Sequence, residues 1–230
     1  MPAINKRLES VNQQIQQALQ NHHRTNDSVK LLAVSKTRPI EDISQAYAAG
    51  QHYFGESYIQ EALTKIAQLK GLNIEWHFIG RIQGNKTRSI AENFDWVHSI
   101  DNPKQIRRLN DQRPSHLAPL NICLQIKIDA EESKAGFAPD QVKAIIDKMA
   151  DYPRLSLRGF MTLPAPAEGL VAQRTPFRKL RLLRNQLATP EIPLETLSMG
   201  MSDDLEAAIA EGSTIVRIGT AIFGPRNYPT

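Results

Sequence analysis

The chain has 230 residues, of which 41% are hydrophobic and 23% charged, a composition that fits a soluble protein with one large core or two small ones. No window approaches the roughly 18 continuous apolar residues of a membrane span, and the first residues hold no apolar signal region, so we expect a cytoplasmic protein. The net charge of +4 comes from scattered basic residues, which argues against a specific nucleic-acid surface.

The chain opens with a helical pattern. Apolar residues recur at spacings of three and four from Ile4 to Leu19, which predicts an amphipathic helix. Short β-rich runs then alternate with helical patterns along the rest of the chain. The expected strands are residues 30–36, 52–57, 75–80, 96–101, 121–128, 155–163, 196–200 and 214–219.

About eight strands separated by helices predict a parallel sheet that is covered by helices. The length fits an α/β protein with a closed (β/α)8 barrel of the TIM type, because such barrels typically need about 250 residues. A doubly wound open sheet is the alternative. The proline-rich residues 163–169 fit one loop. We expect one domain, in which an extra N-terminal helix in residues 1–28 packs on a barrel formed by residues 29–230.

Two conspicuous features have a structural interpretation. The basic run at residues 178–184, "RKLRLLR", carries leucines at helical spacing, which predicts an amphipathic helix with its arginines in solvent. Cys123 is the sole cysteine, so an internal disulfide is excluded. Its apolar surroundings predict an unreactive thiol packed inside a strand.

Lys36 follows directly after an apolar run in "LLAVSKT", residues 31–37. Alternation along a strand places Leu32, Val34 and Lys36 on one side, so the lysine is expected to point inward at the C-terminal mouth of the barrel. Barrel enzymes keep their chemistry at that mouth. Partial burial there disfavours the ammonium form and leaves a nucleophilic amine for a Schiff base with a carbonyl. The alternative is a lysine that ends the strand and reaches solvent.

The segment at residues 197–212 predicts a strand, a turn and a helix. Asp203 and Glu206 fit a capping box, and Gly212 fits the end of the helix. Ser202 would then lie at a helix N-terminus, which favours an anion, although a serine at such a position is commonly structural.

Gly219 closes the next strand, and Thr220 follows it. Small side chains at this position let backbone amides approach a phosphate, and the loops after the seventh and eighth strands are the usual phosphate site of barrels. Closure of a barrel brings the first strand beside the eighth, so the lysine and the anion site would be neighbours. A ligand with both an aldehyde and a phosphate satisfies both ends, and pyridoxal 5'-phosphate (PLP) is such a ligand.

Five segments of the chain resemble the YggS/PROSC family of pyridoxal phosphate homeostasis proteins. The similarity covers essentially the whole chain from about residue 29, and the last segment is long and specific. The segments are residues 33–37 (AVSKT), 53–62 (YFGESYIQEA), 76–86 (WHFIGRIQGNK), 97–101 (VHSID) and 197–224 (LSMGMSDDLEAAIAEGSTIVRIGTAIFG). This resemblance implies the barrel fold of the alanine racemase N-terminal domain.

The resemblance also implies roles for single residues. Lys36 matches the family lysine that forms a Schiff base with PLP, and Ser202, Gly219 and Thr220 match positions that hold the phosphate. Arg217 matches the arginine that faces the pyridine nitrogen in the related racemases. An arginine there would keep that nitrogen unprotonated and weaken the ring as an electron sink.

Three positions depart from the family pattern. Ser57 stands where the family commonly has Asn, and Lys127 and Asp129 stand where Asn and Ser are usual. The contacts that the family makes from these strands are therefore not carried over to this chain.

Other polar residues carry weaker signals. His77 and His98 end their expected strands and would reach the mouth, but a lone histidine is commonly a hydrogen-bonded structural residue. Asp203 and Asp204 form a carboxylate pair, which helix capping explains at least for Asp203. Residues 80–86, "GRIQGNK", lack the full phosphate-loop spacing. No His, Cys or carboxylate cluster has metal-ligand spacing, so no metal is expected.

Three functions are compatible with these residues. The first is a PLP-binding protein that holds the cofactor as a Schiff base on Lys36 and acts in intracellular PLP homeostasis without dedicated turnover. The second is a PLP-dependent amino-acid racemase, which needs acid–base groups on both faces of the substrate α-carbon, one of them from a second domain that this sequence lacks. The third is a Schiff-base aldolase acting on a sugar phosphate.

We favour the first function. The expected partners are PLP and apo forms of PLP-dependent enzymes, with no specific nucleic acid and no membrane, and the chain is expected to be a monomer.

Overall fold

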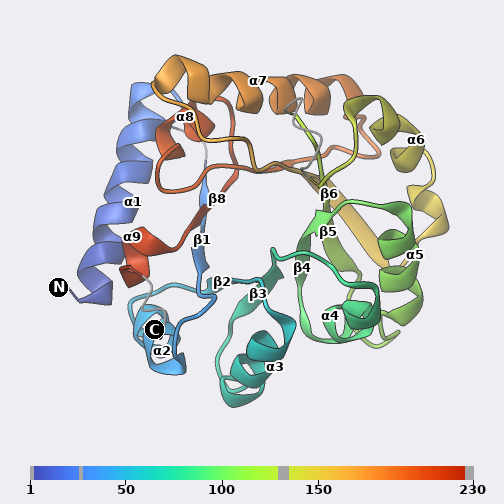
Figure 1. Ribbon diagram of the computed structural model, residues 1–230, viewed down its shortest axis with the longest axis horizontal. Helices are drawn as coiled ribbons and strands as arrows, with labels where there is room; N and C mark the ends of the chain where they lie inside the picture. The colour runs from blue at the N-terminus through green and yellow to red at the C-terminus, as the bar shows by residue number, and fades with distance from the viewer. Residues whose placement is uncertain (1–2, 26–27, 129–134, 226–230) are drawn as a thin grey trace.

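Eight parallel strands close into a barrel in the order in which they follow one another along the chain (Figure 1). The structure is a computed structural model that describes residues 3–25, 28–128 and 135–225. Helices lie around the outside of the barrel (Figure 1). This architecture confirms the (β/α)8 barrel and excludes the open sheet.

All eight expected strands are present, most of them shorter than the patterns indicated. The strands are β1 (Lys30–Val34), β2 (Tyr53–Glu56), β3 (Glu75–Phe78), β4 (Trp96–Ile100), β5 (Leu120–Gln125), β6 (Leu155–Met161), β7 (Thr196–Ser198) and β8 (Ile215–Ile218).

The helices that connect and cover these strands include the expected opening helix. The α-helices are α1 (Ile4–Asn21), α2 (Ile40–Ala48), α3 (Ile59–Gln68), α4 (Thr87–Asn93), α5 (Pro103–Gln112), α6 (Val142–Ile146), α7 (Leu170–Leu187), α8 (Leu205–Ala210) and α9 (Thr220–Phe223). Single 3₁₀ turns lie at Gly84–Lys86, Pro139–Gln141 and Met149–Asp151. None of the helices in the described residues is long and apolar enough to cross a membrane.

Closure of the barrel depends on the pairing of β1 with β8. Leu32 pairs with Arg217 and Ala33 pairs with Ile218 in a continuous parallel register. The first and last strands therefore end at the same mouth of the barrel, as the sequence predicted.

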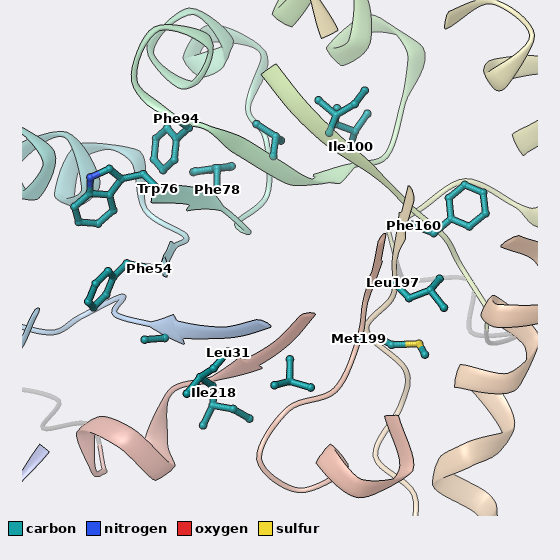
Figure 2. Close-up of a cluster of buried hydrophobic side chains, with 14 of the residues drawn as sticks. Leu31, Phe54, Trp76, Phe78, Phe94, Ile100, Phe160, Leu197, Met199 and Ile218 are labelled. Carbon is teal, nitrogen blue, oxygen red and sulfur yellow. The ribbon is translucent and has the colours of Figure 1, made fainter. Parts of the chain in front are cut away.

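The pleat of the strands sorts side chains into two layers. Figure 2 shows the large apolar side chains, Phe54, Trp76 and Phe160 among them, on the outer side of the strands, where the helices cover them. The alternating positions face the interior: a Cβ at Gly55 would lie 3.2 Å from Leu32 Cδ2. Leu32 therefore occupies the lumen, in agreement with the predicted alternation along β1.

Helix α1 packs against helices from both ends of the barrel sequence and ties down the last elements of the chain. Its apolar stripe is buried, and it packs against α2, α8 and α9 (Figure 1). Arg24 donates hydrogen bonds to the carbonyl oxygens of Ile209, at 2.5 Å, and Ser213, at 3.1 Å. Arg7 donates to the carbonyl of Ile222. These bonds satisfy carbonyls at the ends of elements that follow β7 and β8.

The basic run on α7 corrects one expectation. Leu180 is buried as predicted, but Arg181 is half-buried and ion-paired instead of lying free in solvent. Its guanidinium donates to the carboxylate of Glu211 at 2.8 Å, and Arg174 donates to the other oxygen at 2.8 Å. The Glu211 side chain is only 2% exposed, so a buried carboxylate needs both cations.

Candidate functional site

Lys36 lies at the mouth of the barrel, two residues beyond the end of β1. Ser35 continues the pairing for one more residue, because its N–H donates to the carbonyl of Gly55 at 3.0 Å. Lys36 is half-buried and lines a cleft of about 510 Å³ with residues of the loops that follow β2 and β3. The predicted placement of this lysine at the mouth is confirmed, although it follows the strand rather than ending it.

The cleft around Lys36 is cationic. Arg81 and Lys86 also line it, together with apolar side chains such as Ile79. Ser57, one of the departures from the family pattern, is a further lining residue. Three cations around one cleft favour a ligand that carries negative charge.

A buried ionic cluster holds the backbone on the N-terminal side of Lys36. Lys65 on α3 donates to the carbonyl of Ser35 at 2.7 Å, to Glu56 at 2.8 Å and to Glu61 at 2.5 Å. The hydroxyl of Ser35 donates to the same oxygen of Glu56 at 2.6 Å. We call Ser35, Glu56, Glu61 and Lys65 the Lys65 cluster.

The same cluster holds the backbone on the other side of Lys36. The N–H of Thr37 donates to Glu61 at 2.6 Å. Thr37 has a φ of 64°, a left-handed conformation that is strained for a β-branched residue. The hydrogen bond to Glu61 offsets part of this strain, so Lys36 lies between two residues whose backbone is tied to one cluster.

Burial raises the pKa of Glu56, although Lys65 and Ser35 oppose the shift. Its second carboxylate oxygen is buried without a hydrogen-bond partner in the described chain. One lysine therefore pairs with two carboxylates, of which Glu56 is fully buried and Glu61 is partly exposed.

The segments after β7 and β8 leave the barrel side by side. The N–H of Arg217 donates to the carbonyl of Gly200 at 2.9 Å, which extends the pairing beyond β7. A Cβ at Gly219 would lie 3.3 Å from the carbonyl oxygen of Val34, so the glycine lets β8 approach β1 closely. Thr220 begins α9, a short helix that the sequence analysis did not predict, and its side chain is exposed.

The expected capping box is wrong. Helix α8 begins at Leu205, so its N-cap is Asp204 and not Asp203. Residues 202–204 form a turn, in which the Asp204 carboxylate accepts the N–H of Met201 at 2.5 Å. Local hydrogen bonding of an aspartate to the turn competes with helix capping, and here the turn prevails. The predicted end of the helix is confirmed, since Gly212 has a φ of 90°.

Ser202 is not brought into the cleft of Lys36. It is exposed and lines a groove of about 370 Å³ with residues of α1, α7 and α8. Gly219 and Thr220 are also absent from the described lining of the Lys36 cleft. The structure thus places Gly219 against β1, whereas Ser202 lies in a neighbouring groove.

Arg217 lies inside the barrel and is 5% exposed. Its guanidinium donates to the hydroxyl of Ser198 at 2.8 Å and to the carbonyl of Thr162 at 2.9 Å. Within the described chain these bonds use two of the five N–H groups of a guanidinium. Burial lowers its pKa to about 10, with Asp204 acting in the opposite direction.

His77 and His98 do not end their strands, which run on to Phe78 and Ile100. They lie inside the barrel and are hydrogen-bonded to each other at 2.8 Å. His98 also bonds to Ser198 at 2.7 Å, which links the pair to the partner of Arg217.

The histidine pair is also hydrogen-bonded to the first residue of β3. His77 bonds to Glu75 at 2.8 Å, and Glu75 accepts from Lys30 at 2.8 Å. Burial opposes ionisation of Glu75, but hydrogen bonds from His77 and Lys30 outweigh it and lower its pKa to about 2. The interior of this barrel therefore holds charged and polar groups beside branched apolar side chains such as Leu32, whereas branched apolar layers dominate in the usual barrel.

The remaining sequence predictions concern Cys123, Lys127, Asp129 and metal binding. Cys123 is fully buried, and burial raises the pKa of its thiol to about 12, as fits a packed thiol. Lys127 is half-buried beside a small cavity at the end of β5. Asp129 lies outside the described residues. Within the described residues, no group of three or more His, Cys, Asp or Glu side chains could hold a metal ion.

Two sets of site residues were missed by the sequence analysis. The Lys65 cluster gave no local signal, because its members come from three separate elements. Glu75, which was not singled out from the sequence, did give one, since Glu75 and His77 alternate with Trp76 and Phe78 in β3. That alternation indicates a strand with a polar inner face.

Comparison with known proteins adds the family. The family model for the alanine racemase N-terminal domain matches residues 7–227. A protein of Haemophilus influenzae named pyridoxal phosphate homeostasis protein is 49% identical over 99% of this chain and 98% of its own. The protein of the same name from Pseudomonas aeruginosa is 50% identical over 99% and 98%. The chain belongs to the pyridoxal phosphate homeostasis protein family.

Solved structures agree with this family. PipY of Synechococcus elongatus, described with PLP bound, is 35% identical, covers 96% of this chain and 100% of its own, and has a TM-score of 0.83. The alanine racemase of Corynebacterium glutamicum, at 19% identity, has a TM-score of 0.67 over 98% of this chain and 62% of its own. The second likeness shows the shared fold alone.

We predict that Lys65→Met destabilises the protein by about 3–5 kcal/mol, because it leaves the fully buried carboxylate of Glu56 without a cation and also removes the partner of Glu61. Urea unfolding of the purified variants measures the change. The matched control is Lys143→Met, which removes a lysine from an exposed pair with Asp147 and should cost about 1 kcal/mol or less. Equal losses for the two variants would contradict the structural role of the cluster.

We predict a pH-dependent contribution of Glu75. Its pKa is 4.5 in the unfolded chain and about 2 in the folded protein. Ionised Glu75 therefore stabilises the fold fully above pH 4.5, and this stabilisation is lost as the pH falls toward about 2. Glu75→Gln should lose about 1–2 kcal/mol at pH 7, a figure reduced for partial solvent exposure, and little at pH 2. Urea unfolding across this range tests it, with the exposed Glu92→Gln as control. A constant difference across the range would disprove the linkage.

Proposed function

We propose that the chain binds PLP, that Lys36 forms a Schiff base with the aldehyde of the cofactor, and that the protein acts in intracellular PLP homeostasis. The observation that carries this proposal is the placement of Lys36 at the mouth of the barrel, in a cleft whose other described cations are Arg81 and Lys86. In the covalent step the lone pair of the neutral amine attacks the aldehyde carbon, and the carbonyl oxygen leaves as water.

The residues present fit such a ligand. A cleft of about 510 Å³ is within the range of small-molecule sites, and its cations suit a phosphate. The absent side chain of Gly219 and the start of α9 at Thr220 leave backbone N–H groups beside β1 for an anion. Arg217 would supply N–H hydrogen-bond donors to the ring nitrogen of PLP, but it would not give up a proton to that nitrogen. Bound PLP would contribute an aldehyde and an aromatic ring that withdraws electrons.

The names of the relatives support a role in supply of the cofactor. Proteins named pyridoxal phosphate homeostasis protein match this chain over 98% of their own length at 49% and 50% identity. Apo forms of PLP-dependent enzymes are the proposed recipients, and the chain is proposed to act as a monomer in the cytoplasm.

The donor set argues for binding without dedicated turnover. A guanidinium keeps its protons at neutral pH and donates to the ring nitrogen, which leaves that nitrogen unprotonated. An unprotonated ring stabilises negative charge on a bound amino acid poorly. Transamination and decarboxylation need that stabilisation, whereas the related racemases act with an arginine at the same position and differ in their second acid–base group.

The decisive experiment traps the covalent bond. Wild-type protein loaded with PLP should be yellow, and borohydride should abolish the visible band and fix the cofactor to the peptide that contains Lys36. Lys36→Ala should lose both the band and the labelled peptide. Lys143→Ala, which removes an exposed lysine outside the cleft, is the control and should keep them. Label retained by Lys36→Ala would refute the assignment.

We propose that the phosphate of PLP reaches beyond the Lys36 cleft to Ser202 and Thr220, and we predict that Ser202→Ala and Thr220→Val weaken the retention of PLP more than that of unphosphorylated pyridoxal. A hydrogen bond to a charged group is worth about 1.5–3 kcal/mol, or roughly 10- to 150-fold in affinity. Equilibrium dialysis with each of the two ligands measures the ratio. Equal losses for the two ligands would place the phosphate elsewhere.

We predict no racemase, transaminase or decarboxylase turnover above the slow background of free PLP. Stoichiometric PLP-loaded protein is incubated with each of several L-amino acids, and chiral composition and keto-acid release are followed over hours. Sustained multiple turnovers on any one of them, lost in Lys36→Ala, would replace this proposal with the racemase-like alternative.

A further inference from the structure

A continuous chain of hydrogen bonds crosses the interior of the barrel from Arg217 to Glu75. The links are Arg217 to Ser198 at 2.8 Å, Ser198 to His98 at 2.7 Å, His98 to His77 at 2.8 Å and His77 to Glu75 at 2.8 Å. Its members come from four different strands, β3, β4, β7 and β8. The chain therefore joins strands that lie apart around the barrel wall.

The two ends fix the position of every proton in the chain. A guanidinium only donates, so Ser198 accepts from Arg217. An ionised carboxylate only accepts, so Nε2 of His77 carries a proton and donates to Glu75. A neutral His77 then accepts at Nδ1 a hydrogen bond that Nε2–H of His98 donates. His98 in turn accepts at Nδ1 from the Ser198 hydroxyl.

The neutral state of both rings agrees with their surroundings. Each histidine is fully buried, and burial lowers the pKa of both. For His98 the cationic neighbours Arg217 and Lys30 add to the effect of burial. Glu75 is ionised because its pKa is about 2.

Such a chain transmits orientation and not protons. Reversal of its bonds would require loss of a proton from Arg217 and gain of one by Glu75, which removes both charges that stabilise the chain. The rings are also held by stacking, because His77 lies at 5.4 Å and 7° from the ring of Trp96. The guanidinium of Arg217 is thus held in one orientation by groups that have a single arrangement.

We propose that Ser198, His98, His77 and Glu75 are positioning residues for Arg217, which they hold in a fixed orientation against the ring of the bound cofactor. This inference rests on the proposed function, in which the ring nitrogen of PLP accepts a hydrogen bond from Arg217. The positioning residues extend from Ser198, next to Arg217, to Glu75, the first residue of β3.

The proton order is tested first in the protein without cofactor. Long-range ¹H–¹⁵N correlation spectra of the imidazoles, assigned with single histidine variants, identify the protonated nitrogen of each ring. The expected result is a neutral ring with Nε2–H for both His77 and His98 between pH 6 and 8. A proton on Nδ1 of either ring, or a charged ring, would overturn the proposal whether or not the protein binds PLP.

The effect on the cofactor is tested with PLP labelled with ¹⁵N in the ring. Ser198→Ala removes the link next to Arg217, and the ring ¹⁵N signal should move toward its protonated value, with retention of PLP weaker by about 2- to 10-fold. Ser198→Thr keeps the hydroxyl and should restore the wild-type signal. Cys123→Ala is the matched control, because it also removes one γ atom from a fully buried side chain close to Arg217 and breaks no bond of the chain.

The two proposals fail in different ways. Wild-type protein that does not take up the labelled cofactor would refute the proposed function, while the imidazole spectra would still decide the proton order. Wild-type protein that binds the cofactor, with the same ring signal in Ser198→Ala as in Cys123→Ala, would overturn the positioning role alone.

Discussion

The pairing of β1 with β8 is the interaction on which the candidate site depends. It places Leu32 opposite Arg217, and beyond the ends of the two strands it brings Gly219 against Val34. Lys36 and Gly219, whose backbone belongs to the proposed anion site, therefore leave the barrel from adjacent strands. Neither residue would have a functional neighbour in an open sheet, where the first and last strands are edges.

Stability and function occupy opposite faces of the same strands. The outer faces carry the large apolar side chains that the helices cover (Figure 2). Most of the hydrophobic burial therefore takes place on the outer faces, and the inner faces of β3, β4, β7 and β8 can hold polar groups. These groups are tolerated because each is hydrogen-bonded, since an unsatisfied polar group in this interior would destabilise the fold.

The sequence was sufficient to predict elements whose signals are local. Alternation and composition located the eight strands and the opening helix, and the position of Lys36 after an apolar run placed it at the mouth. The start of α8 was wrong because Asp204 bonds to the turn rather than to the helix, a choice between two short-range hydrogen bonds of similar strength. The Lys65 cluster and the chain from Arg217 to Glu75 could not be predicted, because their members meet only when the barrel closes.

The bonds that Arg24 makes with the segment after β7 have a consequence for synthesis of the chain. Arg24 and Ile209 are separated by 185 positions in the sequence. At ribosomal rates of about 5–20 residues per second, roughly 10–40 s pass between the appearance of the two partners. During that time α1 exposes its apolar stripe and β1 offers an unpaired backbone edge, which is a template for aggregation. The nascent chain is therefore most in need of chaperones just before its last strand emerges.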